Sequence, residues 1–237
     1  MTEKGLAESR SRAQAMISEG FVLLNGKTVK KPSLAVADGD TVTVTERLRF
    51  VSRGGEKLLG AIKEFSPEIE GKVCVDIGAS TGGFTDCLIQ HGAEKVYAVD
   101  SGTDQLHPSL AEHPKVVKME KTNARALTWE MLGERCDLAV MDVSFISQTL
   151  LYPAVKSVLK KDGRFISLIK PQFETTASAL GSGGILRDPK ARQRAVDGVL
   201  RTAEEYGMKL LALVTSPITG GDGNTEYLAY FAVNVEE

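Results

Sequence analysis

Residues 75–86 (VDIGASTGGFTD) constrain the fold of this chain more than any other segment. An apolar strand over residues 72–77 runs directly into a glycine-rich turn, and this turn opens a helix. Glycine has no Cβ, so such a turn lets the backbone approach a ligand closely, and the first helical turn presents free N–H groups. The segment therefore predicts a nucleotide-type binding site at the end of a strand.

Spacing excludes two common phosphate-binding loops. A dinucleotide fingerprint would need glycine where Ser80 stands, and a P-loop would need lysine where Phe84 stands. About 20 residues downstream, a second predicted strand over residues 95–99 ends in Asp100, whose carboxylate can accept hydrogen bonds from ribose hydroxyls. The pattern predicts a loop that binds a ribose-containing ligand without a phosphate-binding lysine.

The composition is that of a globular protein. With 237 residues and 42% hydrophobic content, the chain predicts one sizeable domain and a small one. No apolar run approaches the ~18 residues of a membrane span, and the N-terminus has no hydrophobic signal core, so a cytoplasmic protein is expected. The three cysteines and three histidines lack the spacing of a metal site, and no metal is expected.

The net charge of −2 hides an asymmetry along the chain. Residues 1–63 contain 11 lysines and arginines against 7 acidic residues, whereas residues 64–237 contain 18 against 24. The basic N-terminal part is therefore the expected contact for a polyanion.

The first 46 residues predict a small α+β unit. Ser9 is a suitable N-cap for a helix, and Asn25-Gly26 is a strong hairpin signal. Threonine and valine alternate over residues 41–45, which predicts a strand. Its basic side chains are expected to form one phosphate-binding face, with an ordinary solvated surface as the alternative. These are Arg10, Arg12, Lys27, Lys30 and Lys31.

From about residue 65 onward, strands and helices alternate, which predicts an α/β fold with a parallel sheet covered on both faces. The expected strands cover residues 73–77, 95–99, 116–119, 138–141, 165–169, 210–216 and 227–233, and the expected helices cover residues 85–91, 149–159 and 190–205. Because only a short turn separates the last two strands, they are expected to pair antiparallel. The domains are predicted as residues 1–46, a linker and leading helix over 47–63, and residues 64–237.

Ligands of open α/β sheets bind beyond the carboxyl ends of the strands, so polar residues there are the candidate site. Those at or just after the ends of the first five strands are Asp76, Gly78, Asp100, Asn123, Asp142 and Lys170. Glu226 begins the last strand, whose antiparallel direction brings it to the same edge, and Lys57 precedes the whole fold.

Two lysines and two carboxylates at one edge predict a device that activates a weak hydroxyl nucleophile. Burial and a second nearby ammonium lower the pKa of a lysine, whereas neighbouring carboxylates raise it, and the sequence leaves open which effect dominates. The alternative for any one of the four residues is membership of a surface ion pair.

Two resemblances add to this interpretation. Residues 1–46 resemble an S4-type RNA-binding domain through residues 5–13 and the hairpin over residues 22–27. Members of that family usually begin with a further stretch that forms most of the first helix, so this domain is expected to be incomplete at its start.

The whole chain resembles the TlyA proteins, often labelled hemolysin A, which join an S4-like domain to an FtsJ-like RNA methyltransferase domain. The matching segments are residues 51–55, 57–58, 76–86, 97–100, 142–147, 170–174, 183–189 and 223–227.

The TlyA resemblance implies a Rossmann-like, seven-stranded methyltransferase sheet, S-adenosylmethionine as methyl donor, ribosomal RNA or a ribosomal subunit as partner, and a ribose 2′-hydroxyl as acceptor. It implies a catalytic Lys-Asp-Lys-Glu tetrad, which here is Lys57, Asp142, Lys170 and Glu226. The expected cofactor-binding residues are Asp76, Gly78, Ser80, Thr81, Gly82, Gly83, Phe84, Asp100, Asn123 and Asp142. The expected RNA-binding residues are the five basic residues of the small domain and Arg53.

Two other functions remain as alternatives. The family label suggests a membrane-damaging hemolysin, but the sequence has neither a secretion signal nor a long cationic amphipathic helix. The second alternative is an RNA-binding protein that keeps the cofactor site without catalysis, which the intact tetrad disfavours.

Overall fold

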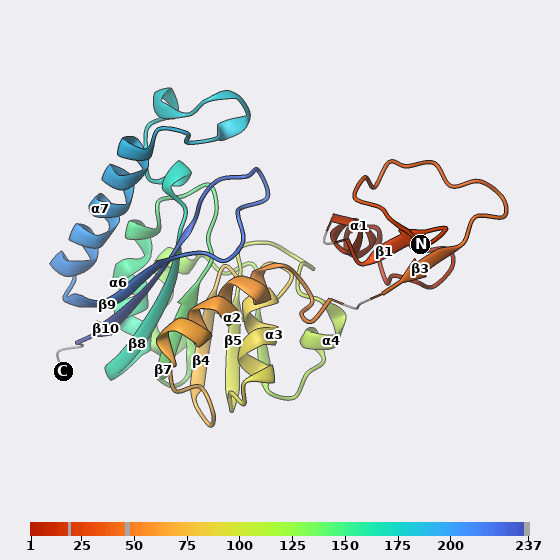
Figure 1. Ribbon diagram of the computed structural model, residues 1–237. Coiled ribbons are helices and arrows are strands. Elements are labelled where there is room, and N and C mark those ends of the chain that lie inside the picture. The colour runs from red at the N-terminus through yellow and green to blue at the C-terminus, as the bar shows by residue number, and fades with distance from the viewer. Residues whose placement is uncertain (19, 46–47, 235–237) are drawn as a thin grey trace. The chain divides into compact units, whose positions relative to one another are not determined.

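The computed structural model describes residues 1–18, 20–45 and 48–234, and the chain forms two compact units, Met1–Arg53 and Gly54–Glu237. Figure 1 labels most of the helices and strands of both units. The domain boundary predicted between residues 46 and 47 lies outside the described residues.

The small unit is one helix and a three-stranded antiparallel sheet in the order β2-β1-β3. Its elements are α1 (Arg10–Ser18), β1 (Val22–Leu24), β2 (Lys27–Thr28) and β3 (Val42–Val44). The predicted hairpin is confirmed: Asn25 and Gly26 both have positive φ angles, 51° and 78°, as a tight two-residue hairpin turn requires. The Asn25 side chain also bonds to Asp40, at 2.7 Å, which joins this turn to the one before β3.

The large unit contains a seven-stranded sheet in the order β6-β5-β4-β7-β8-β10-β9. The strands are β4 (Val73–Ile77), β5 (Lys95–Val99), β6 (Val116–Met119), β7 (Cys136–Met141), β8 (Leu159–Ile169), β9 (Met208–Thr215) and β10 (Tyr227–Val233). Strands β4 to β8 pair in parallel, and β10 runs antiparallel to both of its neighbours, β8 and β9. The α/β class and the antiparallel pairing of the last two strands are therefore confirmed.

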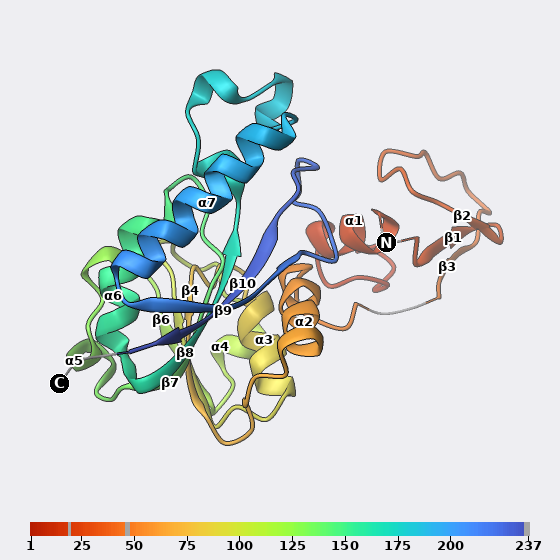
Figure 2. The same cartoon turned by 60° about the vertical axis from the view of Figure 1, so that its left-hand side comes forward.

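Helices cover both faces of this sheet (Figure 2). One face carries α2 (Gly54–Phe65) and α3 (Gly83–Gln90), and the other carries α6 (Tyr152–Val158) and α7 (Pro189–Glu205). Side chains alternate along each strand, so in β4 Val75 and Ile77 join the core that includes α6 and α7, while Asp76 bonds to Thr85 of α3. Short helices α4 (Pro108–Ala111) and α5 (Trp129–Leu132) complete the layers.

The structure differs from the predicted elements most at β8. This strand begins at Leu159, six residues before the expected start, and the preceding helix ends at Val158. Residues 160–162 are charged and exposed, so they carry no apolar pattern, yet the strand start pairs with Cys136 of β7. Pairing between neighbouring strands, rather than side-chain periodicity, sets the length of β8.

None of the described helices is both long and apolar enough to cross a lipid bilayer.

Candidate functional site

Strand register brings three of the four predicted tetrad residues to one edge of the sheet. Tyr227 of β10 pairs with Ile169 of β8, so Glu226 and Lys170 each lie one residue beyond this pair. Met141 of β7 pairs with Ser167 of β8, which places Asp142 just past the end of the neighbouring strand. Three adjacent strands thus deliver two carboxylates and a lysine to the same edge.

The fourth residue, Lys57, reaches this edge from α2. Its Nζ donates to Oε2 of Glu226 at 2.6 Å, and both residues are buried, with 8% and 2% of their surfaces exposed. At the far end of α2, Phe65 stacks on Tyr230 of β10 with ring centroids 5.4 Å apart. The helix is therefore fixed at two points, to β10 and to the residue just before it, and removing one partner of a buried ion pair would leave a charge without its counter-charge.

Lys170 forms the second ion pair of the site. Its Nζ lies 2.6 Å from Oδ1 of Asp142 and donates to Oγ of Ser144 at 2.7 Å. The two side chains of the ion pair are 11% and 21% exposed. Pro171 follows immediately and opens the 3₁₀ turn η3 (Pro171–Phe173). The ammonium group is therefore held in place by two residues of the loop after β7.

The glycine-rich loop lies directly beside Asp142. Gly78 has a φ of 86°, and a Cβ at this position would lie 2.5 Å from the backbone oxygen of Asp142. The N–H of Asp142 also donates to the carbonyl of Ile77 at 3.1 Å. Only glycine permits this close contact. The contact places the glycine-rich loop against the sheet edge that carries the predicted tetrad.

The other loop residues fall into two groups. Ser80 and Thr81 are exposed, whereas Gly82, Gly83 and Phe84 are buried. A Cβ at Gly82 would lie 2.4 Å from Leu110 of α4, and Phe84 is only 3% exposed. Gly82 and Phe84 therefore serve the packing of this loop.

Asp76 is a fully buried carboxyl group with one oxygen left over. Oδ2 accepts hydrogen bonds from the N–H and the hydroxyl of Thr85 at 2.9 and 2.7 Å, while Oδ1 has no hydrogen-bond partner in the described part of the chain. Burial raises the pKa of Asp76 to about 7, against the lowering effect of the Thr85 bonds. A buried acceptor without a partner beside a glycine loop fits a ligand that brings a hydrogen-bond donor or a positive charge.

Asp100 joins two loops at this edge. Its Oδ2 accepts from the N–H of Ser80 at 2.8 Å, and its Oδ1 accepts from the N–H of Gly102 at 2.7 Å. Each carboxylate oxygen keeps a second lone pair, so Asp100 can still accept ligand hydroxyls. Asn123 is exposed, and its side-chain oxygen accepts from the N–H of Arg125 at 3.0 Å.

Glu120, which sequence reasoning missed, organises the loop after β5. Its carboxylate accepts the N–H groups of Asp104, Gln105 and Leu106. These bonds, that of Asp104 foremost, lower the pKa of Glu120 to about 2. The available signal was its position, because Glu120 directly follows β6 as Asp100 follows β5.

Phe145 is a second residue that the sequence did not single out. Its side chain is 92% exposed, its φ is 64°, and its ring centroid lies 5.1 Å from that of Phe173. The Phe173 ring in turn lies 6.0 Å from Nζ of Lys170. A large exposed aromatic on a strained backbone next to a candidate site suggests a contact surface for a substrate.

Glu174 connects the two loops that carry Lys170 and Asp142. Its Oε2 accepts from Oγ of Ser147 at 2.6 Å, and its Oε1 accepts from the N–H of Gln148 at 2.8 Å. Burial raises the pKa of this carboxyl group above its ordinary value. The loop after β8 is thus fastened to the loop after β7 close to both ion-paired residues.

The predicted RNA-binding residues of the small unit differ in their surroundings. Arg10, Lys27, Lys30, Lys31 and Arg53 are exposed. Arg12 is only 18% exposed, and its guanidinium donates to the carbonyls of Phe50 and Leu48 at 3.2 and 3.4 Å. Arg12 therefore braces the chain after β3 and does not share the exposure of the other basic residues.

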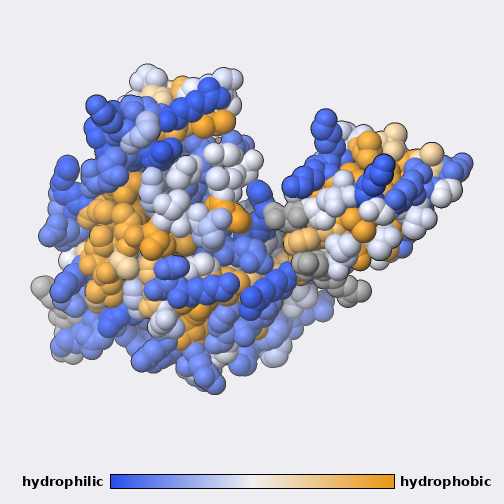
Figure 3. Space-filling view, viewed as in Figure 1, coloured by the Kyte–Doolittle hydropathy of each residue, from blue (hydrophilic) through white to orange (hydrophobic). Residues whose placement is uncertain are grey.

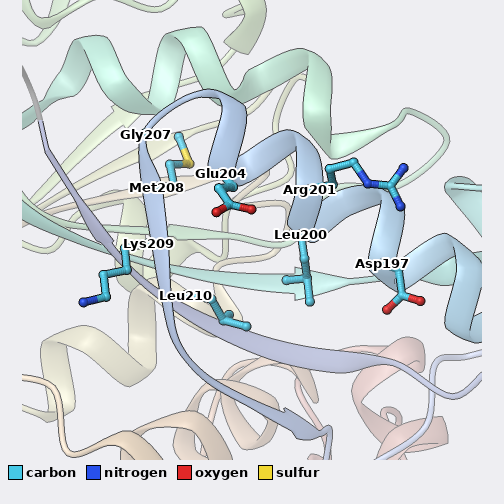
Figure 4. Close-up of a pocket in the computed structure, with 8 residues that line it drawn as sticks. All are labelled: Asp197, Leu200, Arg201, Glu204, Gly207, Met208, Lys209 and Leu210. Carbon is cyan, nitrogen blue, oxygen red and sulfur yellow. The ribbon is translucent and has the colours of Figure 1, made fainter.

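A surface hollow between α7 and β9 is separate from this edge (Figure 4). Figure 4 draws its lining residues, Asp197, Leu200, Arg201, Glu204, Gly207, Met208, Lys209 and Leu210. None of the predicted site residues lines it.

Comparison with known proteins adds to this geometry. The FtsJ-like methyltransferase family matches residues 50–232, and the S4 domain matches residues 1–42. The 16S/23S rRNA (cytidine-2'-O)-methyltransferase TlyA of Mycobacterium tuberculosis is 42% identical over 239 residues, which cover 100% of this chain and 89% of that protein. Hemolysin A of Brachyspira hyodysenteriae is 42% identical over 231 residues, with 97% and 96% covered. The solved structure of a candidate hemolysin from Streptococcus thermophilus is 39% identical, covers 98% of this chain and 86% of its own, and superposes with a TM-score of 0.80.

Proposed function

Because the chain belongs to the FtsJ-like methyltransferase family and has an S4 domain at its N-terminus, we propose that it methylates a ribose 2′-hydroxyl of ribosomal RNA, with S-adenosylmethionine as donor. The observation that carries the proposal is the pair of lysine–carboxylate contacts at one sheet edge, directly beside the glycine-rich loop. The TlyA relative, 42% identical over the full chain, is named for the same modification.

Three groups would hold the methyl donor: the backbone of the loop over residues 78–83, Asp100 and Asp76. When bound, S-adenosylmethionine supplies an electrophilic methyl group on a positively charged sulfur. Asp100 is suited to ribose hydroxyls because it ends the strand next to the glycine loop. The free oxygen of Asp76 is a suitable acceptor for a donor group of the ligand, and the ionised form of Asp76 favours a cation.

Lys170 is the residue that acts on the proton of the 2′-hydroxyl. As a free amine it would accept this proton, and as an ammonium it would stabilise the developing negative charge on the oxygen. Asp142 and Ser144 orient Nζ, since both contact it at 2.6–2.7 Å. Positioning of the hydroxyl supplies much of the acceleration in such a site.

Lys57 and Glu226 complete the network around the hydroxyl. Their side chains are buried and paired, so they hold a fixed charge distribution next to the reacting group. A preorganised site of this kind pays little reorganisation cost during the reaction.

Two surfaces bring RNA to the site. The exposed basic residues of the small unit, Arg10, Lys27, Lys30, Lys31 and Arg53, bind the backbone through its phosphates. The exposed ring of Phe145 stacks on an unpaired base, as aromatic side chains do in single-stranded RNA recognition. Because ribosomal subunits are cytoplasmic, the proposal implies that this protein acts in the cytoplasm.

The test uses the full chain, labelled S-adenosylmethionine and ribosomal subunits from cells that lack the gene. Small and large subunits are assayed in separate reactions. Methylated ribose blocks alkaline cleavage, so the proposal expects label in alkali-resistant dinucleotides of at least one subunit. Label found only in mononucleotides, on a base, or only in ribosomal protein contradicts it. Leakage of dye-loaded liposomes at the same protein concentration, without RNA labelling, would favour the hemolysin alternative.

A further inference from the structure

The N-terminal part of α7 and the segment just before it carry a concentration of positive charge. We call this the α7 basic cluster: Lys190, Arg192 and Arg194 of the helix, and Arg187, which precedes the N-cap residue Asp188. Arg187, Lys190 and Arg194 are exposed, and Arg192 is half-buried. The cluster stands out because residues 64–237 contain more acidic than basic residues, 24 against 18. Figure 3 shows the hydrophilic surface over this part of the molecule, at the upper left.

Helix stability does not account for these charges. The N-terminus of a helix carries a partial positive charge and favours acidic side chains, yet the first two turns of α7 contain three basic residues. Its C-terminal end has the opposite mismatch, with Glu204 and Glu205 where basic residues are favoured. The sequence of α7 therefore places charge against the helix dipole at both ends.

Ion pairing does not account for them either. The carboxylate of Asp188 lies 3.8 Å from Arg194 and also accepts the N–H of Lys190 as helix cap. Among the residues that the structure describes, Arg187, Lys190 and Arg192 form no ion pair. Two exposed cations and the half-buried Arg192 are thus left for a partner outside the unit.

One member of the cluster, Arg194, borders the candidate site. A hollow of about 340 Å³ is lined by Arg194, Ala191 and Ala195 of α7 together with Phe173, Glu174 and Ser147 from the loops that carry the two ion pairs. Phe173 lies three residues after Lys170, and α7 packs against the turn η3 that contains it. A strand of nucleic acid that presents one ribose at Lys170 would have its neighbouring phosphates within reach of α7.

We propose that the α7 basic cluster binds phosphates of the RNA strand that flanks the target nucleotide. This inference rests on the proposed function, since it takes RNA as the substrate. An RNA backbone fits because it is a polyanion with regularly spaced charges. The half-buried Phe173 lines the same hollow as Arg194, and its ring contacts the exposed ring of Phe145, on which a base can stack. The cluster thereby holds the strand at the methyltransferase unit itself, independently of the basic face of the small unit.

The test uses the full chain with the triple substitution Arg187→Gln, Lys190→Gln and Arg194→Gln. Arg201→Gln is the matched control, because Arg201 is exposed on the same helix, about 10 Å further along, in the hollow of Figure 4. We expect the triple variant to raise the Kd and the KM for its ribosomal subunit about tenfold or more near 0.1 M salt. The slope of log K against log salt should fall by about 0.7 to 0.9 for each lost phosphate contact.

Three further measurements separate binding from damage to the fold. The kcat at saturating RNA and the affinity for S-adenosylmethionine should stay at wild-type values in the triple variant, and its urea midpoint should be unchanged or slightly higher. Arg201→Gln should behave as wild type throughout. A triple variant with wild-type KM and salt slope, while wild type methylates RNA, overturns this inference and leaves the proposed function standing.

Binding assays without methyl donor keep the two claims distinguishable. If wild type methylates no RNA, the proposed function fails, and the cluster is then judged by RNA binding alone. Loss of RNA binding in the triple variant supports the cluster as an RNA contact. If RNA binding is unchanged and binding of an acidic polypeptide such as polyglutamate is lost instead, the occupant is a protein and the inference is wrong.

Discussion

Lys57 and Glu226 are separated by 169 positions in the chain, yet Nζ of one lies 2.6 Å from Oε2 of the other, and both are buried. The pair joins the first helix of the large unit to the residue that precedes its last strand. The candidate site therefore depends on contacts between the two ends of this unit.

Replacing Glu226 by Ala should destabilise the protein and abolish methyl transfer. The variant leaves the Lys57 ammonium buried without a partner, which costs about 3–5 kcal/mol. The double variant Lys57→Met, Glu226→Leu should regain much of this stability but no activity. Urea unfolding and single-turnover methylation check both statements, and an active double variant would remove the pair from the mechanism.

Asp76 predicts a pH dependence of cofactor affinity. Burial raises its pKa to about 7, so the ligand-free protein keeps this carboxyl group neutral in weak acid. A cationic ligand prefers the ionised form, so affinity for S-adenosylmethionine should rise from pH 6 to pH 8 and level off above the pKa. Calorimetric titration should find this dependence in wild type and a weak, pH-independent affinity in Asp76→Asn.

The same group makes a prediction about stability. Its pKa in the folded state lies above that in the unfolded chain, where an aspartate ionises near pH 4. At pH values between these two pKa values, the folded state binds more protons than the unfolded chain. The stability of the folded state therefore falls as pH rises from about 4 to about 7. Urea unfolding of ligand-free protein should show a smaller decrease in the free energy of unfolding over this pH range in Asp76→Asn than in wild type. Identical pH profiles of the two proteins would contradict the raised pKa of Asp76.

Phe145 should affect RNA turnover without affecting the fold. Its side chain is 92% exposed, so the midpoint of urea unfolding of Phe145→Ala should equal that of the wild type. Loss of base stacking costs about 1–3 kcal/mol, which lowers kcat/KM for RNA by about 5- to 150-fold. Phe145→Trp is the matched control and should retain activity. Equal losses in both variants would indicate that stacking is not the role of this residue.

Glu174 is expected to act as a positioning residue. Glu174→Ala removes the acceptors for Ser147 and Gln148, so kcat should fall while KM for RNA and affinity for the cofactor stay unchanged. In Glu174→Gln the amide can accept from the N–H of Gln148 and donate to Oγ of Ser147, which should restore most of kcat. Single-turnover rates decide the matter: if Gln is as defective as Ala, the negative charge matters and the bridging geometry does not.

The sheet and the meeting of Asp142, Lys170 and Glu226 at one edge could be predicted from sequence because they follow from periodicity and topology. Lys57 lies on helix α2, and the family resemblance, not the topology, assigned it to the same group. Parallel strands end at one edge, and Asp142 and Lys170 stand where the apolar runs of β7 and β8 stop. Loop geometry could not be predicted, because tertiary contacts determine it. The positive φ of Phe145, the bridge made by Glu174 and the backbone contacts of Arg12 have no local sequence signal.

Glycine has the same limit as a sequence signal. Gly78 and Gly82 look alike in the loop, yet one makes room for the backbone of Asp142 and the other for Leu110. Only the packing of distant segments distinguishes a glycine at the site from a glycine in the core.

The most direct test of the central claim is the rate of 2′-O-methylation by Lys170→Ala, measured in a single turnover on ribosomal subunits with saturating S-adenosylmethionine. We expect the rate to fall by about 10² to 10⁴ while affinity for the cofactor is retained. Lys170→Arg, which keeps the charge but cannot accept a proton at neutral pH, separates a base from an electrostatic role. Methylation by Lys170→Ala at the wild-type rate would contradict the mechanism.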